Sequence, residues 1–126
     1  MINSDRIQDG RITVWTASGR LTFPEIRSKM VDLSTAGISS KVLCDLTKAT
    51  MADLTNAEIE DIITRIGRKI NGSINGKAAI VAHGSVDYGL ARMFGTFSEI
   101  ASLPVTVKVF RNVEVARQWL APQDNG

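Results

Sequence analysis

Two short apolar runs constrain the fold of this chain more than any other feature of its sequence. They are Lys41 to Leu46 (KVLCDL) and Lys77 to Ala82 (KAAIVA), and neither shows the strict alternation of a half-exposed strand. Runs of this length, bounded by polar and turn residues, are typical of strands that are buried on both faces in a parallel sheet. We therefore expect them to be neighbouring central strands.

A hairpin is expected before the first of these runs. The Asp-Gly pair at residues 9–10 is suited to a two-residue turn, and an alternating strand follows it over residues 12–17. Because so tight a turn joins them, the first strand is expected to run antiparallel to the second. Thr22 and Glu25 then form a capping box that predicts a helix, and Gly37 is suited to end it.

Helical patterns also follow both apolar runs. Thr55 and Glu58 form a second capping box. The isoleucines after it fall on one helical face, and they are Ile59, Ile62, Ile63, Ile66 and Ile70. Ser85 is expected to cap a third helix that Pro104 ends. The expected buried stripe of that helix comprises Val86, Leu90, Met93, Phe94, Phe97, Ile100 and Ala101.

The last pattern is a strand over residues 105–109 and a short helix that Asn112 caps and Pro122 ends. The complete order is β, β, α, β, α, β, α, β, α. Strands that alternate with helices in this way call for crossover connections and a parallel sheet. We expect one α/β domain over residues 1–126, with a single mixed, mostly parallel sheet of about five strands, four helices and an N-terminal β-hairpin.

Composition excludes several classes of protein. Fifteen Lys and Arg residues against thirteen Asp and Glu residues give a net charge of +2, too small a surplus to bind the phosphates of nucleic acids. Cys44 is the one cysteine, so no internal disulfide can form, and a reducing compartment is expected. The sequence has no apolar run long enough for a transmembrane segment. These features together favour a cytoplasmic protein.

The order of elements and the segments KVLCDL, YGLARMF and VFRNVEVARQWL resemble the STAS-related family of small domains. That family includes the anti-sigma-factor antagonists and is grouped with the lipid-binding SEC14-like domains. The resemblance extends from about Ile7 to Leu120. It implies a STAS-like fold and a regulatory or protein-interaction role without catalysis, and the motifs behind it determine the fold more than the activity.

The resemblance also implies a candidate regulatory site. In the anti-sigma-factor antagonists, a kinase phosphorylates a serine in an Asp-Ser-Ser-Gly-like stretch after the third strand. Here that stretch becomes residues 53–56, so Asp53 keeps the acid and Thr55 takes the position of the phosphorylated hydroxyl. The second serine and the glycine are absent, and the capping box with Glu58 already explains Thr55. The sequence places no arginine close to it.

Catalytic and metal sites find little support in the sequence. His83 is the one histidine, and an enzyme would need a cleft that brings it to Asp45 or Asp53. One cysteine and one histidine cannot form a tetrahedral zinc site. A cation could be bound by Asp45, Asp53 and Asp87, but the helix dipole already favours Asp87, and no EF-hand spacing occurs. No nucleotide-binding loop is present, so we expect no cofactor.

Two surfaces are candidates for binding a partner or ligand. The loops at residues 46–55 and 83–88 are expected at the carboxyl edge of the sheet, where open α/β sheets bind ligands. Asp45 directly precedes the first loop, the second contains His83, Gly84 and Ser85, and the Gly-Ser pair could also bind an anion through backbone N–H groups. The second surface is the outer face of the third helix. Its expected residues are Tyr88, Ala91, Arg92 and Gly95.

Two functions are compatible with these patterns. The first is a non-enzymatic regulatory or protein-interaction module that binds a protein partner or self-associates. The alternative is a domain that binds a small apolar ligand or lipid, as the SEC14-like side of the resemblance and the apolar residues Met93, Phe94 and Phe97 suggest. A stripe of methionine and aromatic residues belongs to a core more often than to a pocket.

Overall fold

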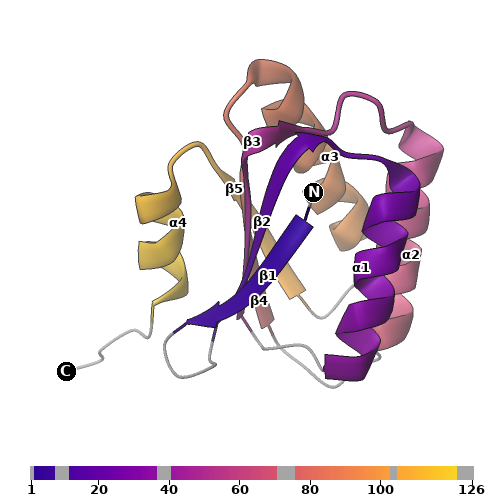
Figure 1. Ribbon diagram of the computed structural model, residues 1–126, viewed down its shortest axis with the longest axis horizontal. Helices are drawn as coiled ribbons and strands as arrows, with labels where there is room; N and C mark the ends of the chain where they lie inside the picture. The colour runs from indigo at the N-terminus through magenta and orange to yellow at the C-terminus, as the bar shows by residue number, and fades with distance from the viewer. Residues whose placement is uncertain (1, 8–11, 37–40, 71–75, 103–104, 122–126) are drawn as a thin grey trace.

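The computed structural model describes residues 2–7, 12–36, 41–70, 76–102 and 105–121 (Figure 1). Its strands are β1 (Ile2–Ile7), β2 (Ile12–Arg20), β3 (Lys41–Thr50), β4 (Gly76–Val81) and β5 (Val105–Phe110). Its helices are α1 (Phe23–Ala36), α2 (Asn56–Ile70), α3 (Ser85–Ile100) and α4 (Val113–Leu120). This order confirms the one expected from the sequence. The expected turn at 9–10 and the expected helix-ending residues Gly37, Pro104 and Pro122 lie outside the described residues.

The five strands form one sheet in the order β1-β2-β3-β4-β5. β1 is antiparallel to β2, with Ile2 opposite Ala17, and the other neighbours are parallel. The two apolar runs are β3 and β4, which pair directly, with Asp45 opposite Val81. The mixed, mostly parallel sheet and the N-terminal hairpin are thus confirmed.

β3 extends further than its apolar run. Residues 47–50 were expected in a loop, yet they continue the strand. They pair with the end of β2 after a register shift between Thr16 and Ser18, which places Arg20 opposite Thr50. This added pairing could not be inferred from residues 47–50 alone, because the hydrogen bonds come from β2.

The helices cover the two faces of the sheet unequally. α1, α2 and α3 lie on one face and α4 lies on the other (Figure 1). Each parallel strand pairs with the next one along the chain, and crossovers between parallel strands share one hand. The helices that connect β2 to β3, β3 to β4 and β4 to β5 therefore lie on the same face, and α4 is the one helix of the described ranges on the opposite face.

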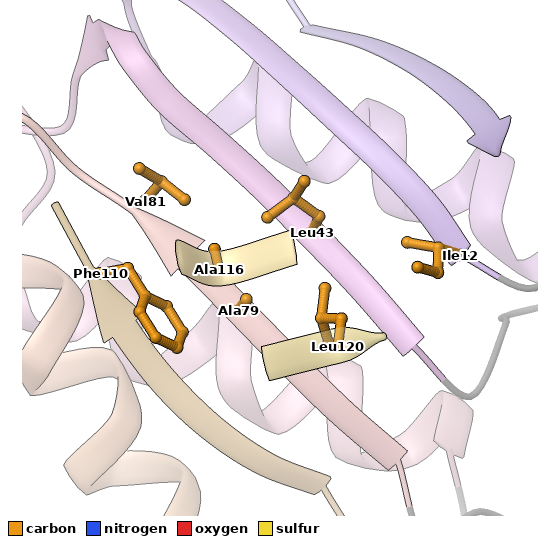
Figure 2. Packing of buried hydrophobic residues seen from close by; sticks show 7 residues of the cluster. All are labelled: Ile12, Leu43, Ala79, Val81, Phe110, Ala116 and Leu120. Carbon is orange, nitrogen blue, oxygen red and sulfur yellow. The ribbon is translucent and has the colours of Figure 1, made fainter. Parts of the chain in front are cut away.

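The core beneath α4 is small and fully apolar (Figure 2). Ala116 and Leu120 of α4 are completely buried against side chains of the sheet. The buried residues of the sheet in this cluster are Ile12, Leu43, Ala79, Val81 and Phe110. The ring of Trp119 packs beside Phe110, with 5.6 Å between their centroids. Asn112 caps the helix, as expected, because its side-chain oxygen accepts hydrogen bonds from the backbone N–H groups of residues 114 and 115.

On the opposite face, the isoleucine stripe of α2 is confirmed where the structure describes it. Ile59, Ile62 and Ile63 are buried, whereas the side chains of Ile66 and Ile70 lie outside the description. The partly buried residues packed on this cluster come mainly from α1 and α3, and they are Phe23, Ile26, Met51, Leu90, Phe94 and Phe97. The contact among helices thus accounts for the aromatic residues of α3.

The expected orientation of α3 is wrong in part. Val86 and Ile100, which were expected in the buried stripe, are 64% and 74% exposed. Ala91, which was expected on the outer face, is completely buried. A Cβ atom added at Gly95 would lie 3.6 Å from a methyl group of Val107 in β5. Small residues let the helix pack closely on the sheet, so α3 turns its small side inward and some of its larger apolar residues outward.

Candidate functional site

The strands β2 to β5 end at one edge of the sheet, which we call the rim (residues 19–21, 50–55, 82–88 and 110–112). Beyond β4 the chain enters α3 on one face, and beyond β5 it enters α4 on the other (Figure 1). A divergence of connections from neighbouring strands is the feature that creates binding sites in open α/β sheets. The ends of β4 and β5 are therefore the part of the rim best suited to binding.

Arg111 and Tyr88 meet at this divergence. The guanidinium carbon of Arg111, directly after β5, lies 4.1 Å from the ring centroid of Tyr88 in α3. Tyr88 is half-buried against Ile80 and Ala91, whereas Arg111 is exposed. Tyr88 was expected from the sequence as a binding residue, whereas Arg111 was not. The sequence feature that could have identified Arg111 as a candidate is its position directly after a strand, at the carboxyl edge of the sheet.

His83, Gly84 and Ser85 form the exposed link between β4 and α3. Gly84, with extended backbone angles, is the N-cap of α3, and its carbonyl accepts a hydrogen bond of 2.8 Å from the N–H of Tyr88. Ser85 is the first helical residue, and no side chain among the described residues caps this end of the helix. The expected capping role of Ser85 is therefore wrong, because the chain enters the helix one residue earlier.

Asp87 fastens the loop after β3 to the start of α3. Its carboxylate accepts a hydrogen bond of 2.6 Å from the backbone N–H of Met51 and one of 3.1 Å from the hydroxyl of Thr50. Both bonds are partly buried and join residues far apart in sequence. Asp87 thus connects two adjacent segments of the rim, in addition to its favourable place in the first turn of a helix.

Asp53 is paired with Arg20 at the end of β2. The guanidinium donates two hydrogen bonds of 2.7 Å, one to each carboxylate oxygen. The side chain of Arg20 is 74% exposed and that of Asp53 is 44% exposed. The hydrogen bonds with Arg20 lower the pKa of Asp53, and they raise that of Arg20. An arginine from a different strand therefore contacts Asp53, two residues before Thr55 in the sequence.

Thr55 begins α2 as part of a complete capping box. Its hydroxyl accepts a hydrogen bond of 3.1 Å from the N–H of Glu58, and the Glu58 carboxylate accepts one of 2.9 Å from the N–H of Thr55. This confirms the capping expected from the sequence. The Thr55 side chain is exposed.

The three carboxylates considered for a cation have separate protein partners. Asp45 accepts two hydrogen bonds from Thr47, one of 3.0 Å from its N–H and one of 2.6 Å from its hydroxyl. Asp53 pairs with Arg20, and Asp87 binds the backbone of Met51. Within the described part of the chain, no group of three or more His, Cys, Asp or Glu side chains could hold a metal ion.

The candidate binding residues on α3 do not all lie on one face of the helix. Arg92 is exposed, as expected, whereas Gly95 faces Val107 of the sheet and Tyr88 lies under Arg111.

Cys44 lies in β3, where burial raises the pKa of its thiol to about 12. None of the helices in the described ranges is both long enough and apolar enough to cross a membrane.

Comparisons with known proteins bear on the fold. No family model matches the chain, and a search of curated proteins finds no match. Among solved structures, the chain is similar to an uncharacterized protein of the DUF3478 family with a SpoIIAA-like fold from Shewanella loihica PV-4. The two share 23% sequence identity with a TM-score of 0.62, over 96% of this chain and 93% of that one. The fold is thus SpoIIAA-like, which confirms the expected STAS-related architecture.

Proposed function

We propose that this chain is a non-enzymatic protein-interaction module that works in the cytoplasm and docks its partner at the rim, where β4 and β5 end. The observation that supports this most directly is the stack of exposed Arg111 on Tyr88, with 4.1 Å between guanidinium carbon and ring centroid. Arginine and tyrosine are the residue types that contribute most often to binding energy at the centre of protein interfaces.

The stack suits Arg111 to recognise a carboxylate of the partner. A guanidinium that lies on an aromatic ring retains donors at its edge for a bidentate contact with a carboxylate. Because the stack already restrains a flexible side chain, less conformational entropy is lost when the partner binds. His83 is exposed on the neighbouring connection and adds a polar group to the same surface. We therefore propose an acidic segment of a protein as the partner.

The contacts of the acidic residues support binding over catalysis. An enzyme at this edge would need Asp45 or Asp53 to orient His83 as a base. The carboxylate of Asp45 instead accepts hydrogen bonds from Thr47, and that of Asp53 is held by Arg20. The Asp45 bonds lie within β3, whereas the pair of Asp53 with Arg20 joins the loop after β3 to the end of β2, as suits a docking surface.

We further propose Thr55 as a position where phosphorylation would regulate docking. Its exposed hydroxyl is accessible, and Arg20 is bound to Asp53, two residues earlier. A phosphate would compete with Asp53 for that guanidinium and would be repelled by Glu58. Phosphorylation is thus expected to loosen the loop. Intact-mass and peptide spectra of native protein without phosphate at Thr55 would count against this regulation.

The apolar-ligand alternative gains no support from the aromatic residues of α3. Phe94 and Phe97 pack against the isoleucines of α2, so their apolar character serves the core.

Affinity purification with single-residue variants tests the docking surface. The tagged chain is used as bait in lysate of cells that express it, and the recovered proteins are quantified by mass spectrometry. Arg111→Glu is expected to lose the partner that the wild type recovers, since it reverses the charge offered to a carboxylate. Arg117→Glu makes the same change at an exposed position of α4 and is expected to retain it. Equal recovery by both variants would contradict the proposal.

A further inference from the structure

We infer that α3 pairs with α3 of a second copy of this chain, in antiparallel orientation about a two-fold axis. The outward face of the helix is the surface that would pair. Five residues at alternating spacings of three and four lie along it, and they are Val86, Gly89, Met93, Thr96 and Ile100. All are exposed except Met93, which is half-buried. This spacing is that of the apolar seam along which two helices pack in a coiled coil.

The seam alternates large and small side chains. Val86, Met93 and Ile100 are large, whereas Gly89 and Thr96 between them are small. A Cβ atom added at Gly89 would meet nothing within 4 Å, so the space above it is open. In an antiparallel pair, the seam position that carries large residues in one helix lies opposite the seam position that carries small residues in the other. The register that sets Met93 opposite Thr96 of the second copy also sets Gly89 opposite Ile100, so Met93 and Ile100 each meet a small residue, and Val86 lies at the end of the seam beyond this paired stretch.

The charges beside the seam complement each other in the same register. Arg92 and Glu99 lie seven residues apart on one flank, and both are exposed. Within the described ranges, the side chain of neither residue makes a hydrogen bond or ion pair. A two-fold axis places Arg92 of each copy against Glu99 of the other, which gives two identical ion pairs. On the other flank, the half-buried Leu90 and Phe97 meet in the same reciprocal way.

The expected dimer is weak. α3 has 16 residues and is therefore about 24 Å long. One helix pair of this length buries less than the roughly 1,200 Å² at which standard protein interfaces begin. We therefore expect a dissociation constant in the micromolar range. Of the seam residues, Val86 is the one that also lies within the rim, so charge reversal at Arg92 or Glu99 tests dimerisation and charge reversal at Arg111 tests docking, and either proposal could fail without the other.

Charge reversal tests the inference on the intact chain. Sedimentation velocity over about 5 to 500 µM is expected to show a monomer–dimer equilibrium for the wild type. Arg92→Glu and Glu99→Arg are each expected to weaken the dimer about tenfold or more, because two-fold symmetry replaces both ion pairs by two repulsive contacts. An equimolar mixture of the two variants is expected to dimerise again, since one copy then offers two negative residues and the other two positive ones.

Arg117→Glu on α4 is the matched control and is expected to dimerise like the wild type. Circular dichroism melting of each variant shows whether it folds, and each substitution lies on an exposed surface. A wild type that stays monomeric over the whole concentration range would overturn the inference. It would be overturned equally if the single variants dimerise as well as the wild type, or if their mixture associates no better than either variant alone.

Discussion

The clearest quantitative prediction concerns Asp87, the carboxylate that joins the loop after β3 to α3. Asp87→Ala removes an acceptor from the Met51 N–H and the Thr50 hydroxyl, at 2.6 and 3.1 Å. Hydrogen bonds to a charged group contribute about 1.5–3 kcal/mol to stability, and a charge in the first turn of a helix contributes about 0.3–1 kcal/mol. Because the site is only partly buried, we expect Asp87→Ala to lower the free energy of unfolding by about 2–3 kcal/mol.

Asp87→Asn separates the two contributions. The amide oxygen can still accept the hydrogen bond from Met51, but the charge is lost. We therefore expect a smaller cost, about 1 kcal/mol. Glu114→Ala is the matched control, since Glu114 is an exposed acid in the first turn of α4. Its carboxylate makes no hydrogen bond or ion pair within the described residues, so only the dipole contribution of about 0.3–1 kcal/mol is lost.

Urea unfolding followed by circular dichroism measures these differences, and amide hydrogen exchange locates them. The Met51 amide is expected to exchange slowly in the wild type and much faster in Asp87→Ala, because its acceptor is gone. The reasoning would be refuted if Asp87→Ala cost no more than Glu114→Ala while the Met51 amide remained equally protected.

Three further predictions concern single residues. The Cys44 thiol, with its pKa raised to about 12, is expected not to react with disulfide reagents at about pH 8 until the chain unfolds, and a rapid reaction of folded protein would contradict this. Its contribution to stability should decline as pH rises from about 9 through 12, because the thiol ionises first in the unfolded chain. Gly19→Ala is expected to destabilise the fold by about 1–2 kcal/mol because φ at Gly19 is +78°, whereas Gly89→Ala should stabilise it by about 1 kcal/mol in urea unfolding of dilute monomer. If Gly19→Ala and Gly89→Ala changed the free energy of unfolding equally, this difference between the two glycines would be refuted. Asn112→Ala should cost about 1 kcal/mol in the same assay, since it removes the acceptor at the start of α4, and an unchanged midpoint would contradict that role.

The order of the elements and the sheet could be predicted because local patterns determine them. The apolar runs that became β3 and β4, and the capping box of Thr55 and Glu58, act through neighbours in sequence. The extension of β3 to Thr50 could not be predicted in this way, because its hydrogen bonds come from β2. Patterns within one segment carry no information about a partner strand that lies elsewhere in the chain.

The same limit applied to the rim and to α3. His83, Asp53 and Tyr88 could be placed at the edge of the sheet from sequence, but the contacts of Arg20 with Asp53 and of Arg111 with Tyr88 join segments that are distant in sequence. On α3, apolar size was taken as the sign of burial. The close approach of the helix to β5 instead favours the small residues Ala91 and Gly95. Size is a poor guide to orientation wherever a helix packs tightly on a sheet.

The unequal cover of the sheet has a consequence for the nascent chain. Strands β1 to β4 can associate in the order of synthesis, since each is added beside the one before it. The apolar surface beneath α4, which includes Ile12 and Leu43, nevertheless stays open to water until Ala116 and Leu120 leave the ribosome. One short helix, translated after every strand, therefore decides whether the newly made protein buries this surface or offers it to aggregation and to chaperones.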